Sequence, residues 1–268
     1  MQLHVRHRTA YLYDQPVKYT AQTLRVTPRR EPRQHTHSWT ILAPGRRTEQ
    51  LDAHGNITHL LTVDDPHREI EIVVSGIVET TGDERPLPHQ GALSPLAYLY
   101  RTPLTQPDEA IAELGRRCVP RPTATREHLL ALAEAVCERV KYCSGATTVE
   151  DPAATVLARG QGVCQDQAHL FIACCRACGV PARYVSGYLY TGEAESDAAS
   201  HAWVDAWIEA QRAWLTIDVT HRQLTDTRHC RLAVGRDYLD AAPVRGVRRG
   251  GGREALEVSV RLSGASQQ

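Results

Sequence analysis

The chain contains 268 residues with a mass of 29.8 kDa, the size of one large domain or two small ones. Its 31 basic and 31 acidic residues give a formal net charge of zero, which argues against a nucleic-acid-binding protein that holds phosphates by bulk charge. Hydrophobic residues make up 42% and charged residues 23%, a composition typical of a globular protein with a buried core.

The sequence also bears on cellular location. No stretch approaches the roughly 18–20 consecutive apolar residues of a membrane-spanning helix. Residues 1–14 alternate between polar and apolar types and carry charges, so they lack the apolar region of a signal peptide. These features predict a cytoplasmic protein. In that reducing compartment the eight cysteines are expected to be free thiols.

Residues 1–82 are predicted to form a small all-β domain. Short segments rich in β-branched residues alternate with turn signals such as Asp14–Pro16, and no helical periodicity is evident before about residue 90. Strands at this spacing are typical of an antiparallel sheet or a sandwich. The predicted strands cover residues 4–13, 23–27, 38–42, 57–63 and 70–79.

Helices and then strands are predicted after a Pro- and Gly-rich linker at 82–95, an order that indicates an α+β core. Asp151 and Pro152 have the residue types of an N-cap and a first helical residue. We therefore divide the rest of the chain into a linker and helical segment at 83–150 and a catalytic core at 151–268, which includes a C-terminal strand. The predicted helices cover 108–118, 125–142, 152–160 and 164–179, and the predicted strands cover 182–190, 201–209, 213–219 and 255–262.

A Gly-rich turn leads into the last of these helices. Gly160 and Gly162 let the chain turn tightly and expose Cys164, which follows them. In the first helical turn, the helix dipole and the free N–H groups stabilise a thiolate, and the same N–H groups can hold the oxyanion of an attacked carbonyl. Cys164 is therefore a candidate nucleophile, although a cysteine at a helix start is by itself a weak signal.

His201 and Asp218 are the candidate base and orienting acceptor that a nucleophilic thiol requires. If the strands predicted at 201–209 and 213–219 pair about a turn centred between Glu209 and Ala210, His201 faces Asp218 directly. If the turn centre is shifted by one residue, the two side chains lie diagonally on the same side of the sheet. The alternate positions between residues 202 and 219 are apolar and are predicted to face the core.

The sequence resembles the transglutaminase-like superfamily, and specifically bacterial proteins with an extra N-terminal β domain that are described as cysteine proteases. The stretches that carry the resemblance are GVCQDQAHLFIACCRACGVPARYVSGYLY, SHAWVDAWI, AWLTIDVT, VGRDYLDAAPVRG and, near the N-terminus, DAHGN. The resemblance implies a papain-like core, with helices packed on an antiparallel sheet, and a catalytic triad of Cys164, His201 and Asp218. This chain departs from the family pattern at Gln167, where an aromatic residue is usual, and at Val219, where proline is usual.

Several other polar residues allow more than one interpretation. His221 is an alternative base, and Asp166 is either a helix-start charge or a substrate contact. Tyr142 is a candidate substitute for the tryptophan that assists catalysis in animal transglutaminases. His169 lies about 140° round the helix from Cys164 and is expected in the core or on the surface. Three cysteines lack the spacing of a zinc site and are expected to be small buried residues: Cys174, Cys175 and Cys178.

The triad predicts an acyl-transfer enzyme that acts on peptide or carboxamide bonds through a thioester on Cys164, with no cofactor or metal. With water as acceptor the enzyme is a peptidase or amidase, which we expect; with an amine as acceptor it is a transglutaminase. A second alternative is a non-catalytic module that binds a peptide or protein. The expected partners are a peptide or protein substrate and, by resemblance alone, a peptide-ligase-like protein, but not nucleic acid or a membrane.

Overall fold

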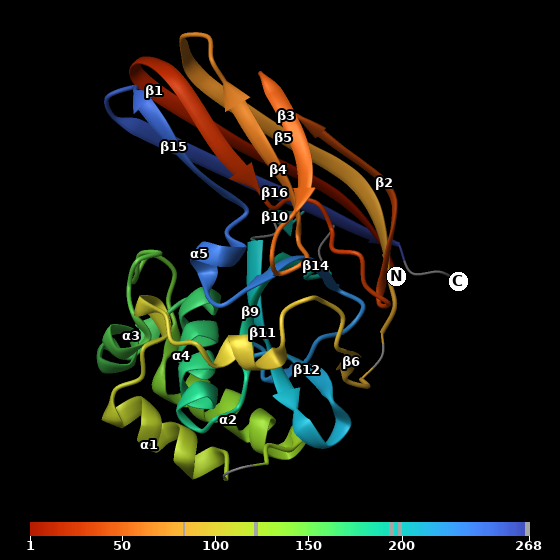
Figure 1. The fold of residues 1–268 in the computed structure, drawn as a ribbon, viewed down its shortest axis with the longest axis vertical. Helices are drawn as coiled ribbons and strands as arrows, with labels where there is room; N and C mark the ends of the chain where they lie inside the picture. The colour runs from red at the N-terminus through yellow and green to blue at the C-terminus, as the bar shows by residue number, and fades with distance from the viewer. Residues whose placement is uncertain (83, 121–122, 193–195, 198–199, 266–268) are drawn as a thin grey trace.

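The computed structural model describes residues 1–82, 84–120, 123–192, 196–197 and 200–265. These residues form an eight-stranded sheet, called here the first sheet, and a six-stranded sheet with helices, called the second sheet (Figure 1). Among the described residues, no helix combines the length and the apolar character needed to cross a membrane. All eight cysteines are free thiols, as predicted.

One long strand, β1 (Gln2–Leu24), organises the first sheet. Over its first half it pairs with β5 (His67–Thr80) on one edge and β16 (Glu254–Ala265) on the other. Over its second half it pairs with β4 (Ile57–Val63) and β15 (Val244–Gly250). The rest of this sheet consists of β2 (Gln34–Leu42), β3 (Arg46–Leu51) and β10 (Ser196–Asp197).

Two sequence-based expectations about the first sheet are wrong. The strand β1 runs through Asp14–Pro16, where a turn is predicted, and its pairing with β5 is irregular between Leu12 and Val17. Proline lacks an N–H group and is tolerated where ladder hydrogen bonds are interrupted. The strand predicted at 255–262 is β16, which pairs with β1 in the first sheet and not with the catalytic core, because the backbone edge of β1 needs a partner along its whole length.

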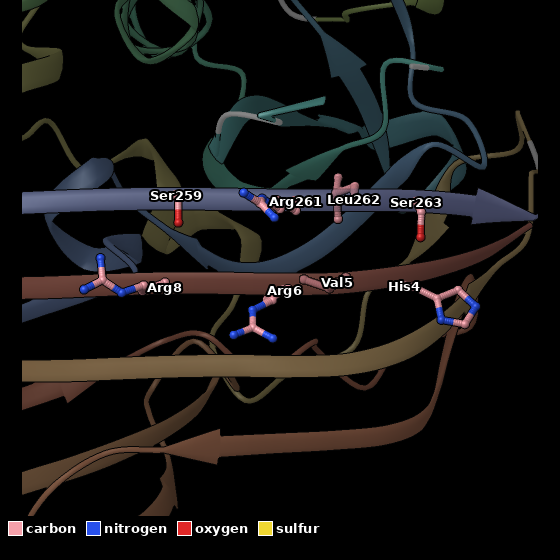
Figure 2. A pocket seen from close by; sticks show the side chains of 8 residues that line it. All are labelled: His4, Val5, Arg6, Arg8, Ser259, Arg261, Leu262 and Ser263. Atoms are coloured by element: carbon pink, nitrogen blue, oxygen red, sulfur yellow. The ribbon is translucent and has the colours of Figure 1, made fainter. Parts of the chain in front are cut away.

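A groove lies on the first sheet between β1 and β16 (Figure 2). Arg6 and Arg8 of β1 and Arg261 of β16 give it a basic lining, and none of the triad residues predicted from the sequence contributes to it. The guanidinium group of Arg8 forms ion pairs with Glu71 and Glu257. The candidate catalytic residues lie instead in the second sheet and its helices.

The second sheet packs against a buried helix, α4 (Cys164–Ala177), which the other helices cover on its remaining sides (Figure 1). The strand order of the second sheet is β13-β12-β11-β9-β14, with β6 added beside β12. The strands are β6 (Leu87–Pro88), β9 (Ala182–Leu189), β11 (Ser200–Ile208), β12 (Ala213–Asp218), β13 (Gln223–Leu224) and β14 (His229–Gly235). The surrounding helices are α1 (Glu109–Cys118), α2 (Arg126–Arg139), α3 (Ala153–Arg159) and α5 (Tyr238–Ala241).

Two predicted helix ends differ from the structure. The helix predicted at 125–142 ends at Arg139, and Lys141–Tyr142 forms the short strand β7, which runs parallel to β8 (Gln161–Gly162). The helix expected after Asp151 begins at Ala153, and the Asp151 carboxylate accepts the N–H of Thr148 at 2.8 Å instead. Local hydrogen bonds of this kind compete with helix capping.

Side-chain amides join the N-terminal region to the edge of β14. The Asn56 amide donates to the carbonyl of Val234 at 2.7 Å and accepts its N–H at 2.8 Å. Gln34 makes the same pair of bonds with the backbone of Arg231, at 2.8 and 2.9 Å. The Asp52 carboxylate in turn accepts both the backbone and the side-chain N–H of Asn56, each at 2.9 Å. The segment DAHGN therefore builds a contact that replaces a neighbouring strand.

Replacing Asn56 with alanine should lower the free energy of unfolding by about 2–4 kcal/mol. The substitution leaves two backbone groups of Val234 buried without a partner, and each unsatisfied group costs about 1–3 kcal/mol. Urea unfolding of wild type and variant measures the difference. Gln50→Ala, on the exposed strand β3, is the control and should change stability by less than about 0.5 kcal/mol. Equal effects of the two substitutions would show that this contact does not stabilise the fold.

Candidate active site

Cys164 is the first residue of α4 and is partly exposed. The preceding helix α3 ends at Gly160, whose φ of 74° lies in the left-handed region that favours glycine. A Cβ at Gly162 would lie 2.8 Å from the side chain of Asp166, so this position also requires glycine. The two glycines therefore allow the tight turn that presents Cys164 at the helix start, as the sequence predicts.

Asp166 has a structural role at the start of this helix. Its carboxylate accepts the backbone N–H of Val163 at 2.8 Å and the hydroxyl of Thr147 at 2.6 Å. The side chain is buried, and burial raises the pKa of Asp166. Of the two interpretations drawn from the sequence, the helix-start role agrees with this geometry and the substrate contact does not.

The first turn of α4 also supplies candidate oxyanion donors. The first N–H groups of a helix have no partner within it. Here the N–H groups of Asp166 and Gln167 both donate to the carbonyl of Val163, at 3.0 and 3.1 Å. The N–H groups of Cys164 and Gln165 are left at the helix start. The N–H of Cys164 is thus placed beside its own thiol, as oxyanion stabilisation requires.

The strand pairing places His201 and Asp218 diagonally. Val204 lies opposite Ile217, so the register is that of the shifted turn, and the connection is a short 3-10 turn at Glu209–Gln211. The side chains of His201 and Asp218 remain on the same side of the sheet, and the His201 Nε2 lies 2.8 Å from Asp218 Oδ2. Direct opposition, the first of the two registers considered, is wrong because the turn is longer by two residues.

The His201 ring connects the thiol to the carboxylate. Besides its bond to Asp218, the His201 side chain interacts with the Cys164 thiol, which contributes to its pKa. Because Nε2 faces Asp218, the nitrogen that serves the thiol is Nδ1. Burial alone would lower the pKa of His201, but its hydrogen bonds to Asp218 and Cys164 outweigh burial and raise the pKa to about 10. The surroundings of His201 therefore favour its imidazolium form.

Three histidines converge on one oxygen of Asp218. Its Oδ2 lies 2.8 Å from His201 Nε2, 2.8 Å from His221 Nδ1 and 3.0 Å from His229 Nε2. Burial opposes the charged carboxylate, but these hydrogen bonds hold the pKa of Asp218 well below its usual range. His221 is a candidate in the sequence, whereas His229 is not, because nothing in the local pattern of β14 indicates a contact with Asp218 of β12.

His221 does not occupy the position of a base. It contacts Asp218 through its ring and its backbone N–H, but its side chain is 47% exposed. The ring whose pKa the Cys164 thiol influences is that of His201. The ligand atoms of His201, Asp218 and His221 lie within 4.8 Å of one another, close enough to consider a metal ion. In this structure the same atoms form hydrogen bonds with one another.

Two of the remaining candidates lie close to the triad. Tyr142 of β7 pairs with Gly162 of β8, two residues before Cys164, and burial raises its pKa. The Gln167 amide donates to the carbonyl of Val140 at 2.9 Å and accepts the hydroxyl of Thr220 at 2.7 Å. The residue that departs from the family pattern therefore ties α4 to the chain just after Asp218.

The other candidates belong to the core. His169 is buried, accepts the N–H of Tyr238 at 3.0 Å, and has its pKa lowered to about 3 by burial. Cys174, Cys175 and Cys178 lie in the core beside α1, as the sequence predicts.

A buried ion cluster, missed by the sequence analysis, lies on the same side of the second sheet as the triad. Asp205 accepts two bonds from Arg231, at 2.5 and 2.9 Å, and one from Arg183 at 2.9 Å. All three side chains are buried, and Arg183 stacks over the ring of Trp214 at 4.3 Å. This polar face is therefore not open to solvent but is part of the interior.

Two family models match the chain. Residues 3–79 match the bacterial transglutaminase-like N-terminal region, and residues 112–219 match the transglutaminase-like superfamily core. The second match spans Cys164, His201 and Asp218. The match to the N-terminal region covers β1 to most of β5 and includes the segment DAHGN.

Relatives extend the similarity over nearly the whole chain. An uncharacterised protein of Mycobacterium tuberculosis (strain H37Rv) is 35% identical over 91% of this chain and 86% of its own length. An uncharacterised protein of Mycobacterium leprae is 29% identical over 97% of this chain and 98% of its own length. A crystal structure from Cytophaga hutchinsonii, named a "putative cysteine protease", has the same fold, with a TM-score of 0.80 and 22% identity over 100% of this chain and 92% of that one. The chain therefore belongs to the transglutaminase-like superfamily, and it carries the N-terminal region of the bacterial members.

Proposed function

We propose that this protein is a cysteine hydrolase that cleaves a peptide or carboxamide bond through a thioester on Cys164. The observation that carries the proposal is the position of the His201 ring, which bonds to the buried carboxylate of Asp218 and whose pKa is raised by Asp218 and by the Cys164 thiol. A nucleophile, a base and an orienting group in this order constitute a catalytic triad. A peptide or a protein is the proposed substrate.

The reaction needs two proton transfers through His201. The Cys164 thiolate attacks the carbonyl carbon, and the N–H of Cys164 stabilises the oxyanion. The His201 imidazolium then protonates the leaving nitrogen as the C–N bond breaks, which releases an amine and leaves the thioester. Neutral His201 next takes a proton from water, whose oxygen attacks the thioester, and the C–S bond breaks to return the thiolate. Asp218 stabilises the imidazolium in both steps.

The acceptor distinguishes a hydrolase from a transglutaminase, because both use the same triad. We favour water because Cys164 is partly exposed, so solvent reaches the thioester. A primary amine of a partner would give acyl transfer from a protein glutamine residue through the same intermediate. The two outcomes differ only in how the thioester is consumed, so one experiment separates them.

Acylation by p-nitrophenyl acetate tests the proposal without knowledge of the natural substrate. Wild type should release nitrophenol in a burst and carry an acetyl group on Cys164, detected by mass spectrometry. His201→Ala should acylate about 10²–10⁴-fold more slowly. His35→Ala, an exposed histidine on β2, is the control and should behave as wild type. Added putrescine shows whether the thioester passes to water or to an amine.

The opposite outcome identifies the non-catalytic alternative. If Cys164 of wild type acylates no faster than it does in His201→Ala, the thiol and the imidazole do not work together. The protein would then be a module that binds a peptide or protein in the same site without turnover.

A further inference from the structure

His229 is a buried residue that links the triad to a second carboxylate. It is the first residue of β14, and its side chain is almost inaccessible to solvent. Its Nε2 lies 3.0 Å from Asp218 Oδ2, and its Nδ1 lies 3.1 Å from both Asp226 Oδ1 and the Asp226 backbone nitrogen. Asp226 is held in turn by the guanidinium group of Arg228, at 2.7 and 2.9 Å. The ring is therefore fixed at both nitrogens.

We propose that His229 is a positioning residue of the acyl-transfer reaction, acting through Asp218 to hold the carboxylate toward His201. This inference rests on the proposed function. His229 contacts the carboxylate on the same oxygen that serves His201, so it restricts the rotation of that group about its side-chain bonds. A carboxylate fixed in this way keeps His201 in the orientation that serves Cys164. Residues that bond to a catalytic group without touching the substrate have this role in other enzymes.

The positions of His221 and His229 distinguish their contributions. Both rings reach Asp218 Oδ2 at hydrogen-bond distance. His221 is half-exposed, so water competes for its bond, whereas His229 is buried and has no such competitor. His229 is also anchored by Asp226, on the side away from Asp218. His221 therefore provides a matched comparison, with the same contact made from the solvent side.

The strand that carries His229 is fixed by the N-terminal region. Gln34 bonds to both backbone groups of Arg231, two residues along β14, and Asn56 bonds to both backbone groups of Val234. The ring of Trp203 meets the His229 ring edge-on, with centroids 5.3 Å apart. The N-terminal region thus holds β14 in the register that brings His229 to Asp218.

The surroundings of His229 favour its charged form. Burial alone would lower the pKa of His229, but hydrogen bonds to two carboxylates raise it. A positive charge on His229, bonded to the carboxylate that serves His201, adds to the positive potential around the triad. The charged and titratable groups around His229 are Asp218 of β12, His201 of β11, Asp226 and Arg228 of the turn before β14, Arg231 of β14 and Glu31 of the N-terminal region.

Alkylation of Cys164 by iodoacetamide between pH 4 and 9 tests this role without a substrate. His229→Ala should slow the reaction about tenfold at pH 6, because Asp218 loses a charge-assisted hydrogen bond. His229→Gln should recover most of that rate, because its amide can donate to Asp218. In the plot of alkylation rate against pH, the acidic limb of His229→Gln should lie at higher pH than that of wild type. Loss of a nearby positive charge makes the thiolate harder to form. His221→Gln should slow the reaction less than His229→Ala does, because water can replace its exposed bond. His35→Gln, at an exposed histidine of β2, is the control and should leave the rate unchanged.

The results distinguish a positioning role of His229 from a merely structural one. If both His229 variants have the profile of wild type, the inference is overturned. The same holds if they lower the melting temperature without slowing the reaction or moving the limb, since His229 would then be merely structural. If His229→Ala does not fold, His229→Gln decides: an acidic limb at higher pH than in wild type supports the inference, and an unmoved limb overturns it. His201→Ala tests the proposed function separately: if it also leaves alkylation unchanged, the proposed function fails as well.

Discussion

Asp218→Asn should lower the turnover number of the acyl-transfer reaction by about 10³–10⁴-fold, as loss of the corresponding carboxylate does in serine proteases. The substitution removes the charge that raises the pKa of His201, so the imidazolium that protonates the leaving amine is no longer favoured. It also places an amide where three imidazole donors converge on one oxygen. The amide nitrogen has no lone pair for them, so His201 loses its orientation as well.

The measurement is the rate of acetyl transfer to Cys164 and of its release, in wild type and in Asp218→Asn at the same pH. The melting temperature of the variant shows whether the fold is retained. Asp65→Asn, in an exposed turn of the first sheet, is the control and should leave the rate unchanged. A variant that keeps more than about a tenth of the wild-type rate would mean that Asp218 is not the orienting member of a triad.

Asp205→Asn should lower the free energy of unfolding by about 3–5 kcal/mol. In the wild type both Arg183 and Arg231 bond to Asp205. The substitution leaves the buried Arg183 without its carboxylate and Arg231 with Glu31 as its remaining acidic partner. An uncompensated buried charge is much more costly than the net contribution of the intact pair. Since a domain of this kind has about 5–15 kcal/mol of stability in total, the variant should unfold at much lower urea concentration.

The same carboxylate makes this difference depend on pH. Burial opposes the charged form, but the charges of Arg231 and Arg183 lower the pKa of Asp205 to about 2. A depressed pKa gives a contribution that is present above the unfolded value of about 3.9 and is lost as pH falls through about 2. The gap between wild type and Asp205→Asn should therefore be constant at pH 5–7 and shrink between pH 4 and 2.

Urea unfolding at several pH values measures both effects. Asp64→Asn provides the comparison, because the ion pair between Asp64 and Arg46 lies on the surface. Such pairs contribute about 0–1 kcal/mol. If Asp205→Asn and Asp64→Asn unfold at the same urea concentration, the buried cluster does not stabilise the fold.

Local periodicity was sufficient to predict the face of the β-hairpin that packs on α4. The alternate apolar positions from Ala202 to Val219 all lie in the core, and the triad residues lie on the other side, as expected from a period of two. The start of α4 at Cys164 could also be predicted, because two glycines and a helical pattern meet there. These features depend on residues close together in sequence.

The features that could not be predicted depend on residues far apart in sequence. Gln2 pairs with Ala265, and Asn56 bonds to Val234, so no local pattern could place β16 or β14. His229 could not be predicted for a different reason: it lies on β14, which does not pair with β12, so no hairpin register links it to Asp218. Asp205 has the alternation of a solvated residue, and only the tertiary structure shows that Arg231 reaches it.

The pairing of β1 with β16 has a consequence for biosynthesis. The strand β1 leaves the ribosome well before its partner along residues 2–13, which is made some 240 residues later. Cys164, His201 and Asp218 all emerge before that partner. During synthesis one edge of the long strand therefore lacks its native partner, and such an edge invites pairing with other chains. A nascent chain of this protein should be most prone to aggregate in the interval before residues 254–265 appear.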